Sequence, residues 1–122
     1  MVLAWAAVAV WAAVIFVLSA TPNLRLVETD VVDFVVRKAG HMAVFGILAV
    51  LAWRAISYSR QRGALVISLV LTVGYAVTDE FHQSFTSGRH ASPVDVGIDS
   101  TGALIALLAL VAWLRIRSRE VA

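Results

Sequence analysis

The stretch VLAWAAVAVWAAVIFVLSA, residues 2–20, contains no charged side chain. Three further apolar blocks follow at residues 39–53, 63–78 and 96–114, and their main ionisable interruptions are His41 and Asp99. Crossing about 30 Å of hydrocarbon takes roughly 20 helical residues, so each block, with a few flanking residues, is long enough to span a membrane. A soluble helical hairpin needs a polar stripe along each helix, which residues 3–20 and 64–77 lack. We therefore expect an all-α membrane protein, a four-transmembrane-helix bundle with spans at residues 2–20, 38–56, 63–83 and 93–114.

The composition of the whole chain supports this fold class. Of the 122 residues, 61% are hydrophobic and 15% are charged, against about 45–50% and about 25% in soluble domains. A chain of this length forms a single domain, which we place at residues 1–122. The lack of cysteine excludes a disulfide framework, a thiolate metal site and a cysteine nucleophile. The first block has no basic segment before it and a poor cleavage site at its end, so we interpret it as a retained span.

The Lys and Arg residues predict how the bundle is oriented. Six of them fall on the side that holds both termini, namely Arg54, Arg60, Arg62, Arg115, Arg117 and Arg119. Four fall on the other side, namely Arg25, Arg37, Lys38 and Arg89. Because cytoplasmic loops carry the excess of Lys and Arg, we expect both termini to be cytoplasmic. The net charge of +2 follows from this topology, and no base-reading motif accompanies it, so we expect no nucleic-acid partner.

Polar residues gather where three of the spans reach the outer face. The group comprises Lys38 and His41 on the second span, Asp79, Glu80 and Gln83 on the third, Arg89 in the following loop, and Asp95 and Asp99 on the fourth. Residues three or four apart share a helix face, so the polar residues of each span form stripes that can face one another. Between the first two spans, the segment from Thr21 to Arg37 mixes aliphatic residues, found from Leu26 to Val36, with acids and predicts a short amphipathic outer segment.

Most of these charged residues also have a structural interpretation. Ser92 fits an N-cap, and Asp95 is an acid at the third position of the helix that follows it. Asp79 and Glu80 lie near a helix C-terminus, where the macrodipole disfavours negative charge, so they need a cation nearby. A salt-bridge cluster that only holds three helices together is therefore an alternative. Asp99 lies one turn deeper, where a cap explains nothing. A carboxylate at the centre of a span costs about 2.5–3.5 kcal/mol, and the cost is lower at the intermediate depth of Asp99 but still favours a functional or paired role.

Two runs of spaced residues carry a family resemblance. The first is Lys38-x-x-His41-x-x-x-Phe45, and the second is Asp79-Glu80-x-x-Gln83-x-Phe85-x-x-Gly88-Arg89-x-x-Ser92-x-x-Asp95-x-x-x-Asp99-x-x-Gly102. Together they resemble the VanZ-like family of small bacterial integral membrane proteins, over about residues 19–107. The family is named for a protein associated with resistance to teicoplanin-type glycopeptide antibiotics. The chain departs from the family pattern at Phe45, where tyrosine is common, and at Asp99, where asparagine is common. The resemblance implies a location in the bacterial cytoplasmic membrane.

The preferred functional hypothesis is a binding pocket of the cell envelope. Arg89 and Lys38 suit a phosphate or carboxylate because Arg and Lys form charge-assisted hydrogen bonds with such groups. The start of the fourth span adds helix-end amides to the same site. The expected partners are the lipid bilayer and an anionic lipid, a wall precursor or a glycopeptide, and an oligomer is an open possibility.

Two other functions use the same residues. The first is a membrane-embedded hydrolase or transferase that acts on an envelope lipid, with Asp79 or Glu80 as general base and His41 or His82 as acid. It has no organic cofactor motif, but a divalent metal held by Asp79, Asp95 and Asp99 is an option. The second is proton-coupled transport, which is less favoured because no polar residues continue toward the inner face.

Overall fold

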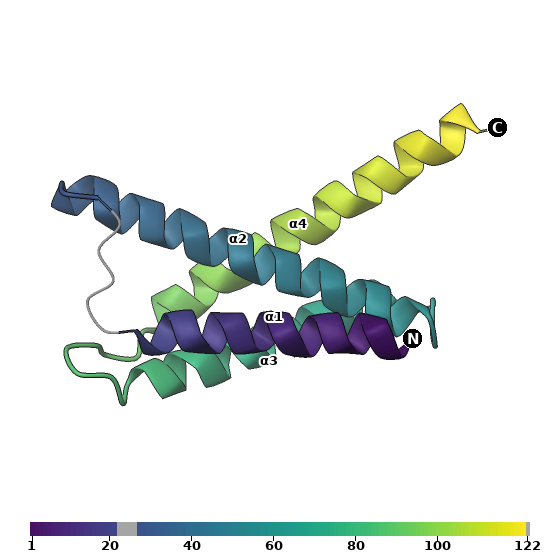
Figure 1. Ribbon diagram of the computed structural model, residues 1–122. Helices are drawn as coiled ribbons and strands as arrows, with labels where there is room; N and C mark the ends of the chain where they lie inside the picture. The colour runs from purple at the N-terminus through teal and green to yellow at the C-terminus, as the bar shows by residue number, and fades with distance from the viewer. Residues whose placement is uncertain (22–26, 122) are drawn as a thin grey trace.

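The computed structural model describes residues 1–21 and 27–121, and every regular element in these ranges is an α-helix. The helices are α1 (Val2–Ala20), α2 (Asp30–Ser57), α3 (Ala64–Gln83) and α4 (Pro93–Glu120), as Figure 1 shows. Each of them is long and apolar enough to cross a membrane. The predicted class, an all-α membrane protein with four spanning helices, is confirmed.

The second helix begins earlier than the predicted span. Residues 30–37, expected within a separate amphipathic segment, form the first turns of α2 instead. Asp30 and Asp33 lie in its first turn, where the positive end of the helix dipole favours acidic side chains. The part of the expected segment that includes Arg25 and Leu26 lies outside the described residues.

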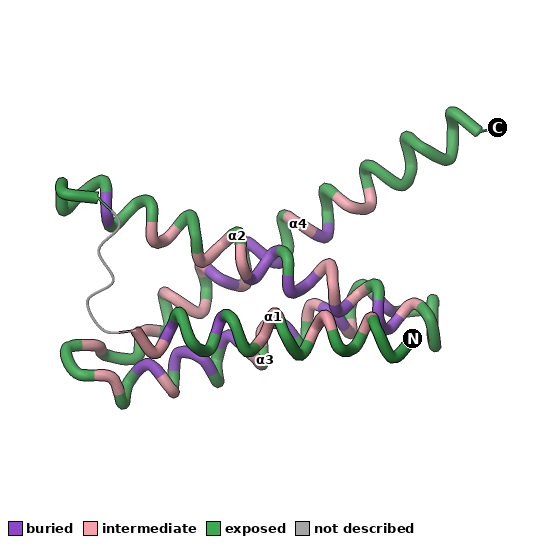
Figure 2. The backbone as a smooth tube through the Cα atoms, viewed as in Figure 1, coloured by how far each residue is buried: buried purple, intermediate pink, exposed green. Residues whose placement is uncertain are grey.

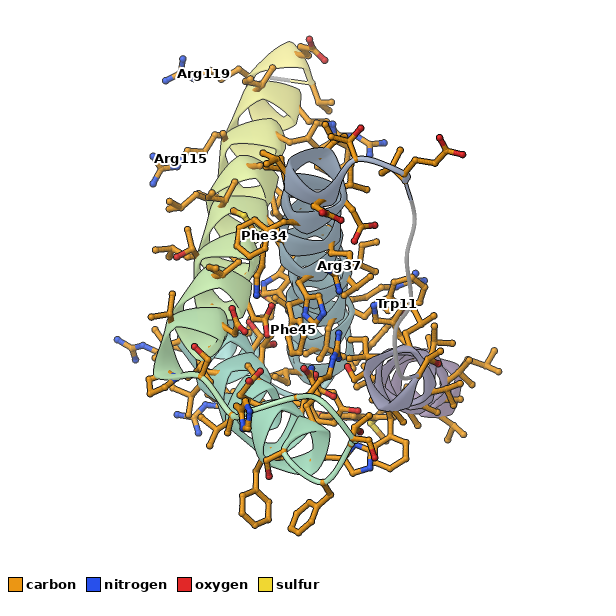
Figure 3. All side chains as sticks on the ribbon, turned by 90° about the vertical axis from the view of Figure 1, so that its left-hand side faces the viewer. Trp11, Phe34, Arg37, Phe45, Arg115 and Arg119 are labelled. Atoms are coloured by element: carbon orange, nitrogen blue, oxygen red, sulfur yellow. The ribbon has the colours of Figure 1, made fainter. Side chains whose placement is uncertain are left out.

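The connections and the chain ends divide between the two ends of the bundle. The C-terminus of α1, the N-terminus of α2 and the α3–α4 connection lie at one end, which we call the polar end. The α2–α3 connection lies at the other end, together with the N-terminus of α1 and the C-terminus of α4 (Figure 1). In the 84–92 loop, Gly88 has a φ of 80°, a backbone conformation that favours glycine. α4 continues past the predicted span to Glu120, and its C-terminal half leaves the other helices. Viewed from the polar end, Arg115 and Arg119 point away from the bundle (Figure 3).

The apolar core lies where α1, α2 and α3 meet. Phe45 of α2 is fully buried there and packs with Ile15 of α1 and Ala76 of α3. The indole Nε1 of Trp11 donates a hydrogen bond to the carbonyl oxygen of Val44 over 2.8 Å, which fixes α1 against α2. Figure 2 shows buried residues along these contacts, whereas the C-terminal half of α4 is mostly exposed. Exposed apolar side chains on such helices suit contact with lipid chains.

α2 and α4 approach each other most closely at two glycines. A Cβ atom added to Gly102 would lie 2.5 Å from the Cα atom of Met42 and 2.7 Å from its carbonyl carbon. A Cβ atom added to Gly46 would lie 3.0 Å from the Cβ atom of Ala106 and 3.2 Å from the carbonyl oxygen of Gly102. Small residues at a helix crossing let the backbones touch, so the α2–α4 contact depends on the missing side chain at position 102.

We expect Gly102→Ala to lower the thermal unfolding midpoint of the full-length protein in detergent, because overpacking a tight contact costs about 1–3 kcal/mol. The matched control is Gly97→Ala on the same helix, where an added Cβ atom meets nothing within 4 Å. This control should be neutral or stabilising, since alanine is the better helix former. Equal midpoints for the two variants, measured by circular dichroism, would contradict the close contact.

Candidate functional site

Seven of the eight polar residues that were predicted to cluster line one cavity at the polar end. They are Lys38, His41, Glu80, Gln83, Arg89, Asp95 and Asp99. The cavity has a volume of about 240 Å³, and α2, α3, α4 and the 84–92 loop all contribute to its wall. We call this cavity the polar pocket. Its other lining residues are Phe34, Arg37, Gly88, His90 and Ile98.

The wall between α2 and α4 is built from two pairs of ionisable side chains. Lys38 forms an ion pair with Asp95, and one turn deeper the Nδ1 atom of His41 lies 3.2 Å from the Oδ1 atom of Asp99. The side chain of Asp99 is almost completely buried, and its Oδ2 atom has no hydrogen-bond partner among the described residues. The pairs match because Lys38 and His41 are three residues apart, Asp95 and Asp99 are four apart, and each set occupies one helix face. Figure 3 shows Phe34 beside this wall, between α2 and α4.

Asp79, the eighth predicted residue, does not line the polar pocket but joins α1 to α3 behind it. Its carboxylate is 2% exposed, and its Oδ2 atom accepts hydrogen bonds from the Ser19 hydroxyl over 2.7 Å and from the Gln83 amide over 2.9 Å. Sequence reasoning missed Ser19 as a member of this site. The signal that marks it is that Ser19 is the one hydroxyl-bearing side chain in the apolar stretch 2–20.

Arg89 reaches from the 84–92 loop to the end of α1 and to the end of α3. Its Nη1 atom donates hydrogen bonds to the backbone carbonyl of Ser19 over 3.1 Å and to the Oε1 atom of Gln83 over 3.0 Å. Gln83 therefore stands between the guanidinium group and the Asp79 carboxylate. Both acceptors of Arg89 are neutral, and within residues 1–21 and 27–121 its guanidinium group forms no ion pair with a carboxylate.

The start of α4 is capped by a residue of another helix. Ser92 is the N-cap and Pro93 is the first residue of α4, but the Ser92 side chain makes no capping hydrogen bond. The Oε1 atom of Glu80 instead accepts a hydrogen bond from the backbone N–H of Ser92 over 2.8 Å. Asp95, for which a capping role was the structural alternative, pairs with Lys38. Glu80 therefore satisfies a helix-end N–H group that would otherwise need water or a side chain of α4.

Two more ionisable residues lie at the polar end, one inside the polar pocket and one outside it. Arg37, which was not among the eight predicted cluster residues, lines the polar pocket and forms an ion pair with Asp33 over 2.9 Å. His82, an alternative general acid, is absent from the lining and stacks on Phe16, with 4.0 Å between the ring centroids. In the described part of the chain, no three His, Asp or Glu side chains are arranged to hold a metal ion.

Comparison with known proteins gives one result. The family model described as VanZ/LLP1 matches residues 4–115, a range that includes every residue lining the polar pocket. No significant match was found among the curated proteins or among the solved structures. The family match agrees with the resemblance carried by the spaced polar residues, and the four apolar helices agree with a multi-pass protein in contact with the lipid bilayer. The chain therefore belongs to the VanZ/LLP1 family of membrane proteins.

Proposed function

We propose that the polar pocket binds the phosphate or carboxylate group of a cell-envelope molecule. The class of ligand is an anionic lipid, a wall precursor or a glycopeptide. The observation that carries this proposal is the environment of Arg89. Among the described residues, its guanidinium group donates hydrogen bonds only to neutral acceptors at the pocket wall. A guanidinium group in that state keeps its charge and most of its N–H donors for an incoming anion, and it presents them in a fork that matches phosphate and carboxylate oxygens.

The acids of the pocket do not oppose an anionic ligand as strongly as their number suggests. Asp95 is paired with Lys38, and Asp99 lies against His41. Glu80 accepts a hydrogen bond at the N-terminus of α4, where the helix dipole supplies partial positive charge. Each of these carboxylates thus has its own compensating partner, whereas Arg89 has no carboxylate partner among residues 1–21 and 27–121.

The proposal includes an orientation and a location. With six Lys and Arg residues on the side of the termini and four on the side of the pocket, both termini face the cytoplasm and the pocket opens outward. The protein then lies in the bacterial cytoplasmic membrane, with the pocket at the leaflet where envelope precursors are used. A role in resistance to teicoplanin-type glycopeptides would follow from binding either the antibiotic or the precursor that the antibiotic recognises.

We expect Arg89→Gln to weaken binding of the true ligand by at least about tenfold, because a hydrogen bond to a charged group contributes about 1.5–3 kcal/mol. The measurement is a titration of the purified full-length protein with phosphatidic acid, a lipid-linked wall precursor and teicoplanin in turn. The control is Arg115→Gln, which removes the same charge from an arginine that points away from the bundle. The proposal fails if none of the three compounds binds, or if both variants bind like the unmodified protein.

A second candidate function is favoured by the pairing of His41 with Asp99. A carboxylate at Nδ1 favours the tautomer with the proton on that nitrogen, which leaves Nε2 as a proton acceptor. His41 lines the polar pocket, so Nε2 could remove a proton from an attacking water or hydroxyl group. This arrangement supports a hydrolase or transferase that acts on an envelope lipid. It makes His41 the base, in place of the acid role expected from the sequence.

For this second candidate, we expect the purified protein to convert an envelope lipid to a product that mass spectrometry detects. His41→Gln should abolish conversion while ligand binding persists, because the substitution removes the base and leaves Arg89 in place. Conversion that stops on addition of a chelator would assign the activity to a bound metal, for which Asp79, Asp95 and Asp99 are not arranged as a ligand group in the described part of the chain. Binding without any product would leave only the binding function.

A further inference from the structure

A second, smaller cavity lies between α1 and α2 beside the polar pocket. It has a volume of about 130 Å³, and we call it the side cavity. Ile15 and Leu18 of α1 and Val44 of α2 supply most of its apolar wall, and Gly40 of α2 contributes backbone with no side chain. An added Cβ atom at Gly40 would meet nothing within 4 Å, so the absent side chain leaves open space.

The two cavities share part of their walls. Arg37, His41 and Arg89 line both the polar pocket and the side cavity. An anion held by Arg89 would therefore lie at the boundary between a chamber walled mainly by polar side chains and one walled mainly by apolar side chains. A molecule that fills both carries an anionic group with a hydrocarbon chain attached close to it.

The side cavity also has access to the apolar exterior of the bundle. Leu18 is 46% exposed, and Gly40 is exposed as well, so the cavity wall continues onto the surface that faces lipid. α1 and α2 diverge toward the polar end, where this cavity lies (Figure 1). A chain that leaves the pocket by this route passes between the two helices and does not cross the charged wall formed by α2 and α4.

We propose that the ligand is a phosphate-bearing lipid whose first chain carbons occupy the side cavity and whose headgroup reaches Arg89 from the bilayer between α1 and α2. This inference rests on the proposed function of the polar pocket and adds the substrate class and the entry route. It favours a lipid-linked ligand over a water-soluble anion, because a soluble anion gains nothing from the apolar wall of the side cavity.

The first test fills the side cavity. Gly40→Leu should weaken binding of dihexanoyl phosphatidic acid by about tenfold, the scale of an overpacked contact, and leave binding of glycerol 3-phosphate unchanged. The control is Gly74→Leu on α3, where an added Cβ atom also meets nothing within 4 Å and which lines neither cavity. Both probes should bind the control as they bind the unmodified protein, with the protein held in phosphatidylcholine nanodiscs.

The second test locates the chain. A phosphatidic acid with a photoreactive diazirine near the start of its acyl chain should label Leu18 or Val44. Labelling of Ile47 or Ile105, in the apolar groove between α2 and α4, would overturn the route. So would an equal loss of both probes in Gly40→Leu, or no loss of either. If glycerol 3-phosphate and phosphatidic acid both fail to bind the unmodified protein, phosphate recognition by the polar pocket fails, and the lipid assignment fails with it.

Discussion

The backbone contact between α2 and α4 at Gly102 is the constraint on which the rest of the site depends. The two helices run in the same direction and touch where Gly102 meets Met42, so side chains on the polar side of this contact can face each other. Two pairs form there, an ion pair between Lys38 and Asp95 and a contact between His41 and Asp99. A side chain at position 102 would push the two stripes apart, and the wall of the polar pocket would open with them.

Burial of so many ionisable groups is tolerated because each carboxylate has a local donor or cation. Asp99 and Asp95 face cations or potential cations of α2, and Asp79 takes hydrogen bonds from two neutral donors. Glu80 uses the free N–H group at the start of α4. An unpaired charge in such surroundings costs far more than a paired one, so the network keeps the helices together as well as shaping the pocket.

The sequence predicted the helices and the meeting of the polar residues because both follow from periodicity and from the short connections. It did not predict which helix each acid would face. Ser19 is the one hydroxyl-bearing side chain in the apolar stretch 2–20, but helix periodicity alone does not indicate that Asp79 turns toward it. Glu80 was expected to need a cation, but the nearby N-terminus of α4 provides the compensation. The early start of α2 was missed because acids at a helix start resemble a separate surface segment.

Two hydrogen bonds of different kinds tie the end of α1 to its neighbours. The Ser19 hydroxyl donates to Asp79, but Arg89 is anchored by the Ser19 main-chain carbonyl. Every residue type has a main-chain carbonyl, so the arginine keeps this hydrogen bond with any residue at position 19, provided that the backbone of the first helix is unchanged there. Replacement of Ser19 by a residue without a hydroxyl group would thus weaken the contact between α1 and α3, while the arginine kept its hydrogen bond to the main chain.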